Sequence, residues 1–104
     1  MKNLDPKLYP FQSHFLGLDG HNLHYIDEGK GSVMLMLHGN PTWSFYYRNL
    51  VHAFKGHYRC VVPDHMGCGL SDKPQDYAYT LEQHVQNVIQ LVRFLDLKKI
   101  PLIV

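Results

Sequence analysis

The sequence predicts an α/β fold in which an antiparallel hairpin leads into a mostly parallel sheet with crossover helices. Three observations support this prediction. An Asp-Gly turn signal separates two apolar-patterned runs between residues 13 and 27, and residues 33–37 form an uninterrupted apolar strand. Two segments with helical spacing of apolar residues then alternate with further short apolar strands. The predicted order is strand, strand, strand, helix, strand, loop, helix, strand, which suits a sheet covered by helices.

The composition favours a small globular protein. The chain has 104 residues, of which 45% are hydrophobic and 18% charged, enough for one core. A net charge of +1 argues against binding to nucleic acid or a membrane surface through electrostatics. The longest apolar run is too short to span a bilayer, and residues 1–11 lack the apolar segment of a secretory signal. Cys60 and Cys68 match neither a disulfide framework nor metal-ligand spacing, so we expect a cytoplasmic protein with reduced thiols.

The first three strands follow from turn chemistry and hydrophobic pattern. Residues 13–18 and 22–27 flank Asp19-Gly20, a dipeptide typical of two-residue hairpin turns. Residues 33–37 do not alternate, and a continuously apolar strand is expected inside a parallel sheet whose two faces are covered by helices. Residues 59–63 form a similar strand.

Both helices are predicted from apolar spacing. In residues 44–55 the side chains expected to pack on the sheet are Tyr46 or Tyr47, Leu50, Val51 and Phe54, and Gly56 supplies a stop. The second helix has a capping box at Thr80 and Gln83. Its apolar stripe comprises Leu81, Val85, Val88, Val92 and Leu95. Residues 100–104 are expected to form the last strand.

The tetrapeptide His38-Gly39-Asn40-Pro41 directly follows a buried strand. Ligands bind at the carboxyl ends of parallel strands, and Asn40 offers a backbone N–H and a side-chain amide to an anion or developing oxyanion. A strand-to-helix turn in which Asn merely tolerates an unusual backbone angle is an equally good reading. Trp43, at the mouth of this turn, suits a core position as well as a pocket wall.

The segment 63–72, PDHMGCGLSD, follows the next strand. It lacks the third glycine of a dinucleotide-binding loop and the Gly-Lys-Ser/Thr of a phosphate loop. Ser71 is not a nucleophile elbow, because no glycine lies two residues further on. We expect Asp64 to accept backbone hydrogen bonds that brace this loop, and Ser71 to cap a turn. The eight histidines show no metal-binding motif and are predicted to be scattered and solvated.

At these motifs the chain, from about residue 11 onward, resembles the α/β-hydrolase superfamily and its haloalkane dehalogenase-like branch. The superfamily marks are His38-Gly39 and the loop Asp64-x-x-Gly67-x-Gly69-x-Ser71. In this branch the asparagine after His-Gly helps to bind halide and its N–H serves the oxyanion hole, whereas epoxide hydrolases usually carry an aromatic residue there. The strings HGNPTWSFYYRNL and PDHMGCGLSDKP look most like the β-lactone decarboxylases of bacterial olefin biosynthesis.

The resemblance implies the N-terminal half of an α/β-hydrolase fold: a lead-in at residues 1–10 and a partial domain at residues 11–104. The cap domain, the nucleophilic aspartate, the catalytic acid and the catalytic histidine would then lie beyond Val104. The implied activity is carbon–halogen hydrolysis or β-lactone decarboxylation on a small apolar haloalkane or dialkyl β-lactone, without a cofactor or metal. The implied site residues are Asn40 as the oxyanion or halide donor, Asn40, Pro41 and Trp43 at the substrate, and His38, Gly39, Asp64, Gly67, Gly69 and Ser71 as structural support.

The same resemblance predicts that the isolated chain is inactive and that its exposed sheet edge self-associates. Two alternatives remain open at this level: a non-catalytic gene remnant, and a fragment of a serine esterase or epoxide hydrolase of the same fold.

Overall fold

The computed structural model describes residues 7–39, 43–97 and 102–103. Five strands form one sheet in the order β1-β2-β4-β3-β5. The elements, in chain order, are β1 (His14–Leu18), β2 (His21–Glu28), β3 (Ser32–Met36), the 3-10 helix η1 (Ser44–Tyr47), α1 (Arg48–Phe54), β4 (Tyr58–Pro63), α2 (Leu81–Phe94) and β5 (Leu102–Ile103). This order confirms the predicted succession of elements. Ile100, Pro101 and Val104 of the predicted last strand lie outside the described residues.

The hairpin forms at the predicted turn. Leu18 pairs with His21 across the antiparallel strands β1 and β2, which leaves Asp19 and Gly20 as the two turn residues. Their φ angles of 50° and 83° are both left-handed, as the turn type that matches the twist of hairpin strands requires. The Asp-Gly signal therefore fixed both the place and the register of the hairpin.

The rest of the sheet is mostly parallel. β2 runs antiparallel to β4, whereas β3 pairs in parallel with β4 on one side and with β5 on the other. Because β3 and β4 are parallel neighbours, their carboxyl ends lie side by side at one edge of the sheet. The segments that follow them, which begin at Leu37 and at Asp64, consequently meet at that edge.

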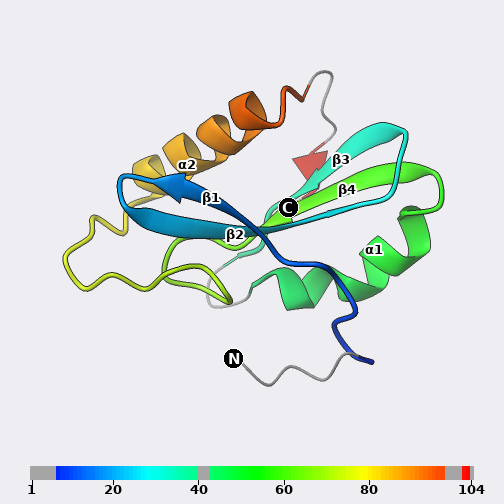
Figure 1. Ribbon diagram of the computed structural model, residues 1–104, viewed down its shortest axis with the longest axis horizontal. Helices are drawn as coiled ribbons and strands as arrows, with labels where there is room; N and C mark the ends of the chain where they lie inside the picture. Colours follow the sequence, from blue (N-terminus) through cyan, green and yellow to red (C-terminus); the bar gives the residue numbers. More distant parts are fainter. Residues whose placement is uncertain (1–6, 40–42, 98–101, 104) are drawn as a thin grey trace.

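The two helices cover opposite faces of the sheet (Figure 1). Alternate residues of the central strands point to the two faces: Met36 and Val62 belong to the core under α1, and Leu35 and Val61 to the core under α2. This two-sided burial explains why the central strands are continuously apolar. None of the helices in the described ranges is both long and apolar enough to cross a membrane.

The first helical segment, η1 and α1, packs on the sheet through fewer side chains than predicted. η1 turns directly into α1, and Tyr47 and Val51 are buried while Phe54 is half-buried. The prediction for Leu50 was wrong, because this side chain is 39% exposed. The buried residues are spaced by four and three positions, so Leu50 falls beside the contact stripe. The side chain of Tyr46 lies outside the described residues.

α2 begins at its predicted cap, where the Thr80 hydroxyl accepts a hydrogen bond from the Gln83 amide at 3.1 Å. The Gln83 side chain donates to Asn87 rather than back to Thr80. The predicted stripe was wrong for Leu81 and Val85, which are 79% and 47% exposed. The helix contacts the core only through its later turns, at Val88, Leu91, Val92 and Leu95. Leu81 and Val85, at the start of the helix, therefore do not belong to the core.

Candidate functional site

The candidate site lies where the carboxyl ends of β3 and β4 meet. His38 and Gly39 follow β3, and the segment here called the β4 loop (residues 64–71) follows β4. Asn40 and Pro41 lie outside the described residues, so the donor role predicted for Asn40 and the substrate contacts of both remain predictions. What the structure describes is how the chain is held on either side of them.

His38 holds the near side of the turn. It is 4% exposed, its Nε2 lies 2.9 Å from the His65 backbone N–H, and its Nδ1 lies 2.7 Å from the Gly39 carbonyl oxygen. An amide can only donate, so Nε2 must accept and be unprotonated, and Nδ1 then carries the proton and donates to Gly39. His38 is therefore a neutral imidazole whose two nitrogens are both used.

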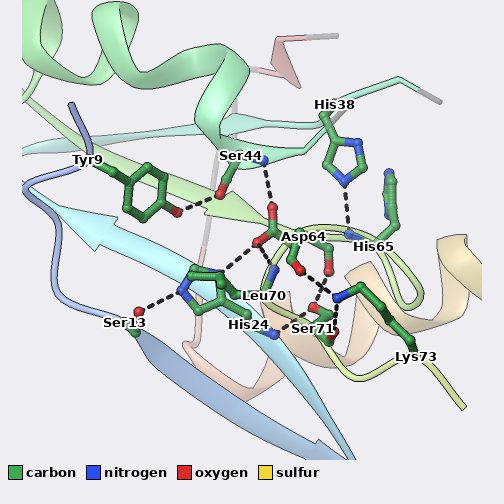
Figure 2. Close-up of polar contacts among 11 residues, drawn as sticks. Tyr9, Ser13, His24, His38, Ser44, Asp64, His65, Leu70, Ser71 and Lys73 are labelled. Carbon is green, nitrogen blue, oxygen red and sulfur yellow. Dashed lines mark hydrogen bonds and ion pairs between the residues drawn. The ribbon is translucent and has the colours of Figure 1, made fainter. Parts of the chain in front are cut away.

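Asp64 holds the far side of the turn. Its Oδ1 accepts from the Ser44 backbone N–H at 2.5 Å, and its Oδ2 accepts from His24 Nδ1 at 2.8 Å and from the Leu70 N–H at 3.1 Å (Figure 2). The carboxylate is fully buried. Burial alone would raise the pKa of Asp64, but the hydrogen bonds from His24 and from the two backbone amides hold that pKa below its ordinary value. Asp64 is thus a structural carboxylate that stays charged.

Ser71 closes the β4 loop. Its hydroxyl donates to the Asp64 carbonyl oxygen at 2.6 Å and accepts from the His24 backbone N–H at 2.8 Å. The hydroxyl therefore bridges the loop to β2 instead of capping a local turn. Both of its hydrogen-bonding functions are occupied and the residue is 2% exposed, which excludes it as a nucleophile.

Glycine is required inside the β4 loop. Gly69 has a φ of +52°, and a Cβ there would lie 2.5 Å from Asp64 Oδ2 and 2.7 Å from the Trp43 ring. Gly67 has a φ of +88°, and its Cβ would lie 2.6 Å from the Tyr79 ring. The two glycines let the loop pass close over Asp64 and Tyr79.

Trp43 packs into the core beside the turn. It stacks on Tyr9 and on Phe45 with ring centroids 5.4 Å from each, and it is half-buried. Tyr9 in turn hydrogen-bonds Ser44 through its hydroxyl at 2.6 Å. The described contacts of Trp43 are those of a core residue at the mouth of the turn, and its predicted contact with substrate stays a prediction.

A cavity of about 550 Å³ opens at this edge of the sheet. Three imidazole rings form a row along it: the His38 and His65 centroids are 4.5 Å apart, and those of His65 and His84 are 4.8 Å apart. The lining residues are His38, Gly39, His65, Met66, Gly67, Cys68, Lys73, Tyr79, Leu81 and His84. Within the described ranges no three ligand-type side chains are placed to hold a metal ion.

Burial favours the neutral forms of the His65 and His84 rings and of the Cys68 thiol in this cavity, whereas the Lys73 ammonium, which also lines it, donates to the Gly69 and Ser71 carbonyl oxygens. Burial, together with the electrostatic effect of the neighbouring His38 and His84 rings, lowers the pKa of His65 to about 4, and burial also lowers the pKa of His84. Burial raises the pKa of the Cys68 thiol, and the nearby Asp64 carboxylate adds to that effect, so Cys68 is not an activated thiolate. The described cavity can therefore accept an apolar molecule with few polar contacts, but it holds no activated nucleophile of its own.

Sequence reasoning missed the role of the histidines. The expectation of solvated rings was wrong for His24 and His38, which are 0% and 4% exposed. His24 lies two residues before the buried Ile26 in β2, so the period of two already placed it on the inward face. The bond between His24 and Asp64 joins residues 40 positions apart, which no local pattern reveals.

Comparison with known proteins agrees with this geometry. Residues 32–104 match the family model described as alpha/beta hydrolase fold. The chain is 54% identical over 94 residues to the cis-3-alkyl-4-alkyloxetan-2-one decarboxylase of Shewanella oneidensis, covering 88% of this chain and 30% of that protein. It is 42% identical over 95 residues to haloalkane dehalogenase 2 of Mycobacterium tuberculosis, covering 91% and 33%.

Solved structures give the same result. A tetrameric haloalkane dehalogenase from Paraglaciecola agarilytica NO2 superposes with a TM-score of 0.82 at 37% identity, over 94% of this chain and 38% of that one. The chain thus spans about a third of the length of the curated relatives that it matches. Since the family model covers well over half of the chain, the chain belongs to the α/β hydrolase fold family.

Proposed function

We propose that this segment supplies the anion-stabilising side of the active site of a haloalkane dehalogenase-like enzyme, and that the enzyme decarboxylates a dialkyl β-lactone. The observation that carries the proposal is the anchoring of the turn after β3. Asp64 and His65, adjacent at the end of β4, hold it from both sides: Asp64 binds the Ser44 amide and the His65 amide binds His38. Asn40 lies in sequence between these two anchors.

The proposed chemistry needs a carboxylate nucleophile and a fixed donor. In a protein of the relatives' full length, an aspartate following β5 would attack the lactone, and Asn40 would stabilise the lactone oxygen. Attack at C4 breaks the ring C–O bond and leaves a carboxylate on C3. Loss of carbon dioxide then breaks the C2–C3 bond, and its electron pair forms the alkene as the bond between C4 and the aspartate breaks. The aspartate is thereby regenerated, and no co-reactant is consumed. Identity supports the lactone as the substrate class, since the decarboxylase relative is 54% identical and the dehalogenase relative 42%.

Carbon–halogen hydrolysis is the second candidate. It is favoured by the superposition on a haloalkane dehalogenase with a TM-score of 0.82. In that reaction Asn40 would bind the departing halide, with Pro41 and Trp43 at the substrate, and water would then release the alcohol from the ester intermediate. Both reactions place the same demand on this segment, a donor held at the carboxyl edge.

The isolated chain of 104 residues is proposed to be inactive, with residues 11–104 forming part of a hydrolase domain after a lead-in at residues 1–10. We further propose that it self-associates through its sheet edge and that the protein is cytoplasmic, in keeping with two free cysteines at positions 60 and 68.

Product analysis tests this proposal. The protein to be assayed contains residues 1–104 joined to the remaining part of the Shewanella oneidensis relative, and it is called the full-length protein below. With a cis-3,4-dialkyl-oxetan-2-one we expect an alkene and carbon dioxide in equal amounts. Halide release from a haloalkane without alkene formation would select the second candidate. Ester hydrolysis alone, through a serine, would contradict the proposal.

A further inference from the structure

We propose that His24 is a positioning residue of the candidate site: its ring orients the Asp64 carboxylate, which in turn fixes the chain at Ser44 and the β4 loop that lines the cavity. The predicted effect on turnover rests on the function proposed above, whereas the predicted effect on geometry does not. His24 itself does not line the cavity, so its action is through Asp64.

His24 and Asp64 form a closed pair in the interior. Both side chains are 0% exposed, and His24 Nδ1 lies 2.8 Å from Asp64 Oδ2. The opposite ring nitrogen, Nε2, lies 3.0 Å from the Ser13 hydroxyl, so the ring is held at both ends (Figure 2). Since the carboxylate can only accept, Nδ1 carries a proton and donates. A charge-assisted hydrogen bond of this kind is among the stronger ones in proteins.

Asp64 passes this orientation to two segments. One carboxylate oxygen accepts a hydrogen bond from the Ser44 amide at the start of η1. The other accepts a hydrogen bond from the Leu70 amide in the β4 loop. The β4 loop contributes His65, Met66, Gly67 and Cys68 to the cavity wall. The direction of one carboxylate thus sets the distance between the turn and the loop on either side of the site.

The main-chain contacts nearby cannot replace the ring. The Asp64 N–H donates to the His24 carbonyl oxygen at 2.8 Å, and the Ser71 hydroxyl bridges the same two backbones. These bonds tie β2 to the end of β4, but they leave the Asp64 side-chain torsions free. Without the ring donor, Oδ2 would retain only the Leu70 amide at 3.1 Å. A buried carboxylate that loses a donor is expected to move toward other partners.

Two substitutions distinguish the effect of the hydrogen bond to Asp64 from the effect of changing the side chain's volume. In His24→Asn the side-chain amide nitrogen can take the place of Nδ1, whereas in His24→Gln it falls near the place of Nε2. His24→Leu removes both donors. Ser13→Ala is the matched control, because it removes the other hydrogen bond of the ring and leaves the bond to Asp64. All four variants are made in the full-length protein, and kcat, KM and the melting temperature are measured for each.

We expect His24→Gln and His24→Leu to lower kcat by about 10- to 100-fold with little change in KM, as a small misplacement of reacting groups does. His24→Asn and Ser13→Ala should stay within a few-fold of the wild type. A merely structural role would lower the melting temperature of all three His24 variants and leave kcat per folded molecule unchanged. If His24→Leu does not fold, the comparison of Asn with Gln decides. Equal kcat in folded Asn and Gln variants would overturn the proposal.

A second readout is independent of turnover. Hydrogen exchange at the Ser44 and Leu70 amides should be faster in His24→Gln than in His24→Asn, because only the latter keeps Asp64 in place. This comparison can be made even if the wild-type protein processes neither proposed substrate, so failure of the proposed function is distinguishable from failure of this inference. Identical exchange at both amides in the two variants would contradict the positioning role.

Discussion

At the scale of single residues, His65 occupies the least favourable place for a positive charge in the described site. Its ring lies between two other imidazoles, with centroids 4.5 Å and 4.8 Å away, and it is partly buried. Burial and the neighbouring rings lower its pKa from 6.5 to about 4. A neutral row of rings is therefore part of the folded structure at neutral pH.

This pKa predicts how stability depends on pH. Between pH 6.5 and about 4 the unfolded chain binds a proton at His65 that the folded chain does not. The stability that the folded protein gains from a neutral His65 is therefore fully present above pH 6.5, and it is lost as the pH falls through about 4. Urea unfolding at pH 7, 5.5 and 4 should show a falling free energy of unfolding, with a shallower fall in His65→Leu. The exposed His57 offers the control: His57→Leu should keep the wild-type slope. A wild-type slope in His65→Leu would contradict the assignment.

The residue scale is also where sequence reasoning reached its limit. Asp64 accepts backbone hydrogen bonds of the kind expected from its place after a buried strand. The sequence did not reveal that His24 is its partner, because the two are brought together by the pairing of β2 with β4. A contact between residues far apart in the sequence leaves no local sequence pattern, whereas strands and turns do.

At the scale of elements, the described residues expose one strand edge and several apolar side chains of a helix. β5 is the last strand of the sheet order and pairs only with β3. On α2 the exposed apolar side chains are Leu81, Val85 and Phe94. An open strand edge and exposed apolar side chains on a helix each favour association.

We therefore predict that the isolated 104-residue chain self-associates. Sedimentation velocity over a hundredfold range of concentration should show a rising average mass. The double variant Val85→Lys/Phe94→Lys should reduce this rise, because a charged side chain at either position opposes its burial in a contact between two chains. Gln86→Lys/Gln90→Lys adds the same charge at exposed polar positions of the same helix and is the matched control. A monomer at all concentrations would show that the edge is protected.

The elements also show which periodicities were informative. The uninterrupted apolar strands correctly predicted burial on both faces, and the Asp-Gly turn correctly predicted the hairpin register. The helix stripes were wrong for Leu50, Leu81 and Val85 and right for the other predicted residues that the structure describes, which are Tyr47, Val51, Phe54, Val88, Val92 and Leu95. Spacing identifies the side of a helix that is apolar, but it does not show how much of that side contacts the core.

At the scale of the whole molecule, the sequence predicted the fold and placed two of its motifs after neighbouring strands of the sheet. Strands with continuous apolar runs require covering helices, and parallel neighbours bring their carboxyl ends together. His38-Gly39 and the β4 loop consequently meet at one edge around the described cavity. The substrate class could not be derived in the same way, because both candidate reactions need the same donor from this segment.

The substitution Asn40→Ala in the full-length protein tests whether the turn after β3 provides the donor that stabilises charge during turnover. We expect kcat to fall by about ten- to a thousandfold with the melting temperature nearly unchanged, as for loss of one oxyanion donor. Trp43 and Asp64 anchor the chain around this position through contacts that Asn40→Ala leaves in place. A folded Asn40→Ala protein with wild-type kcat on the lactone and on the haloalkane would contradict the donor role of Asn40.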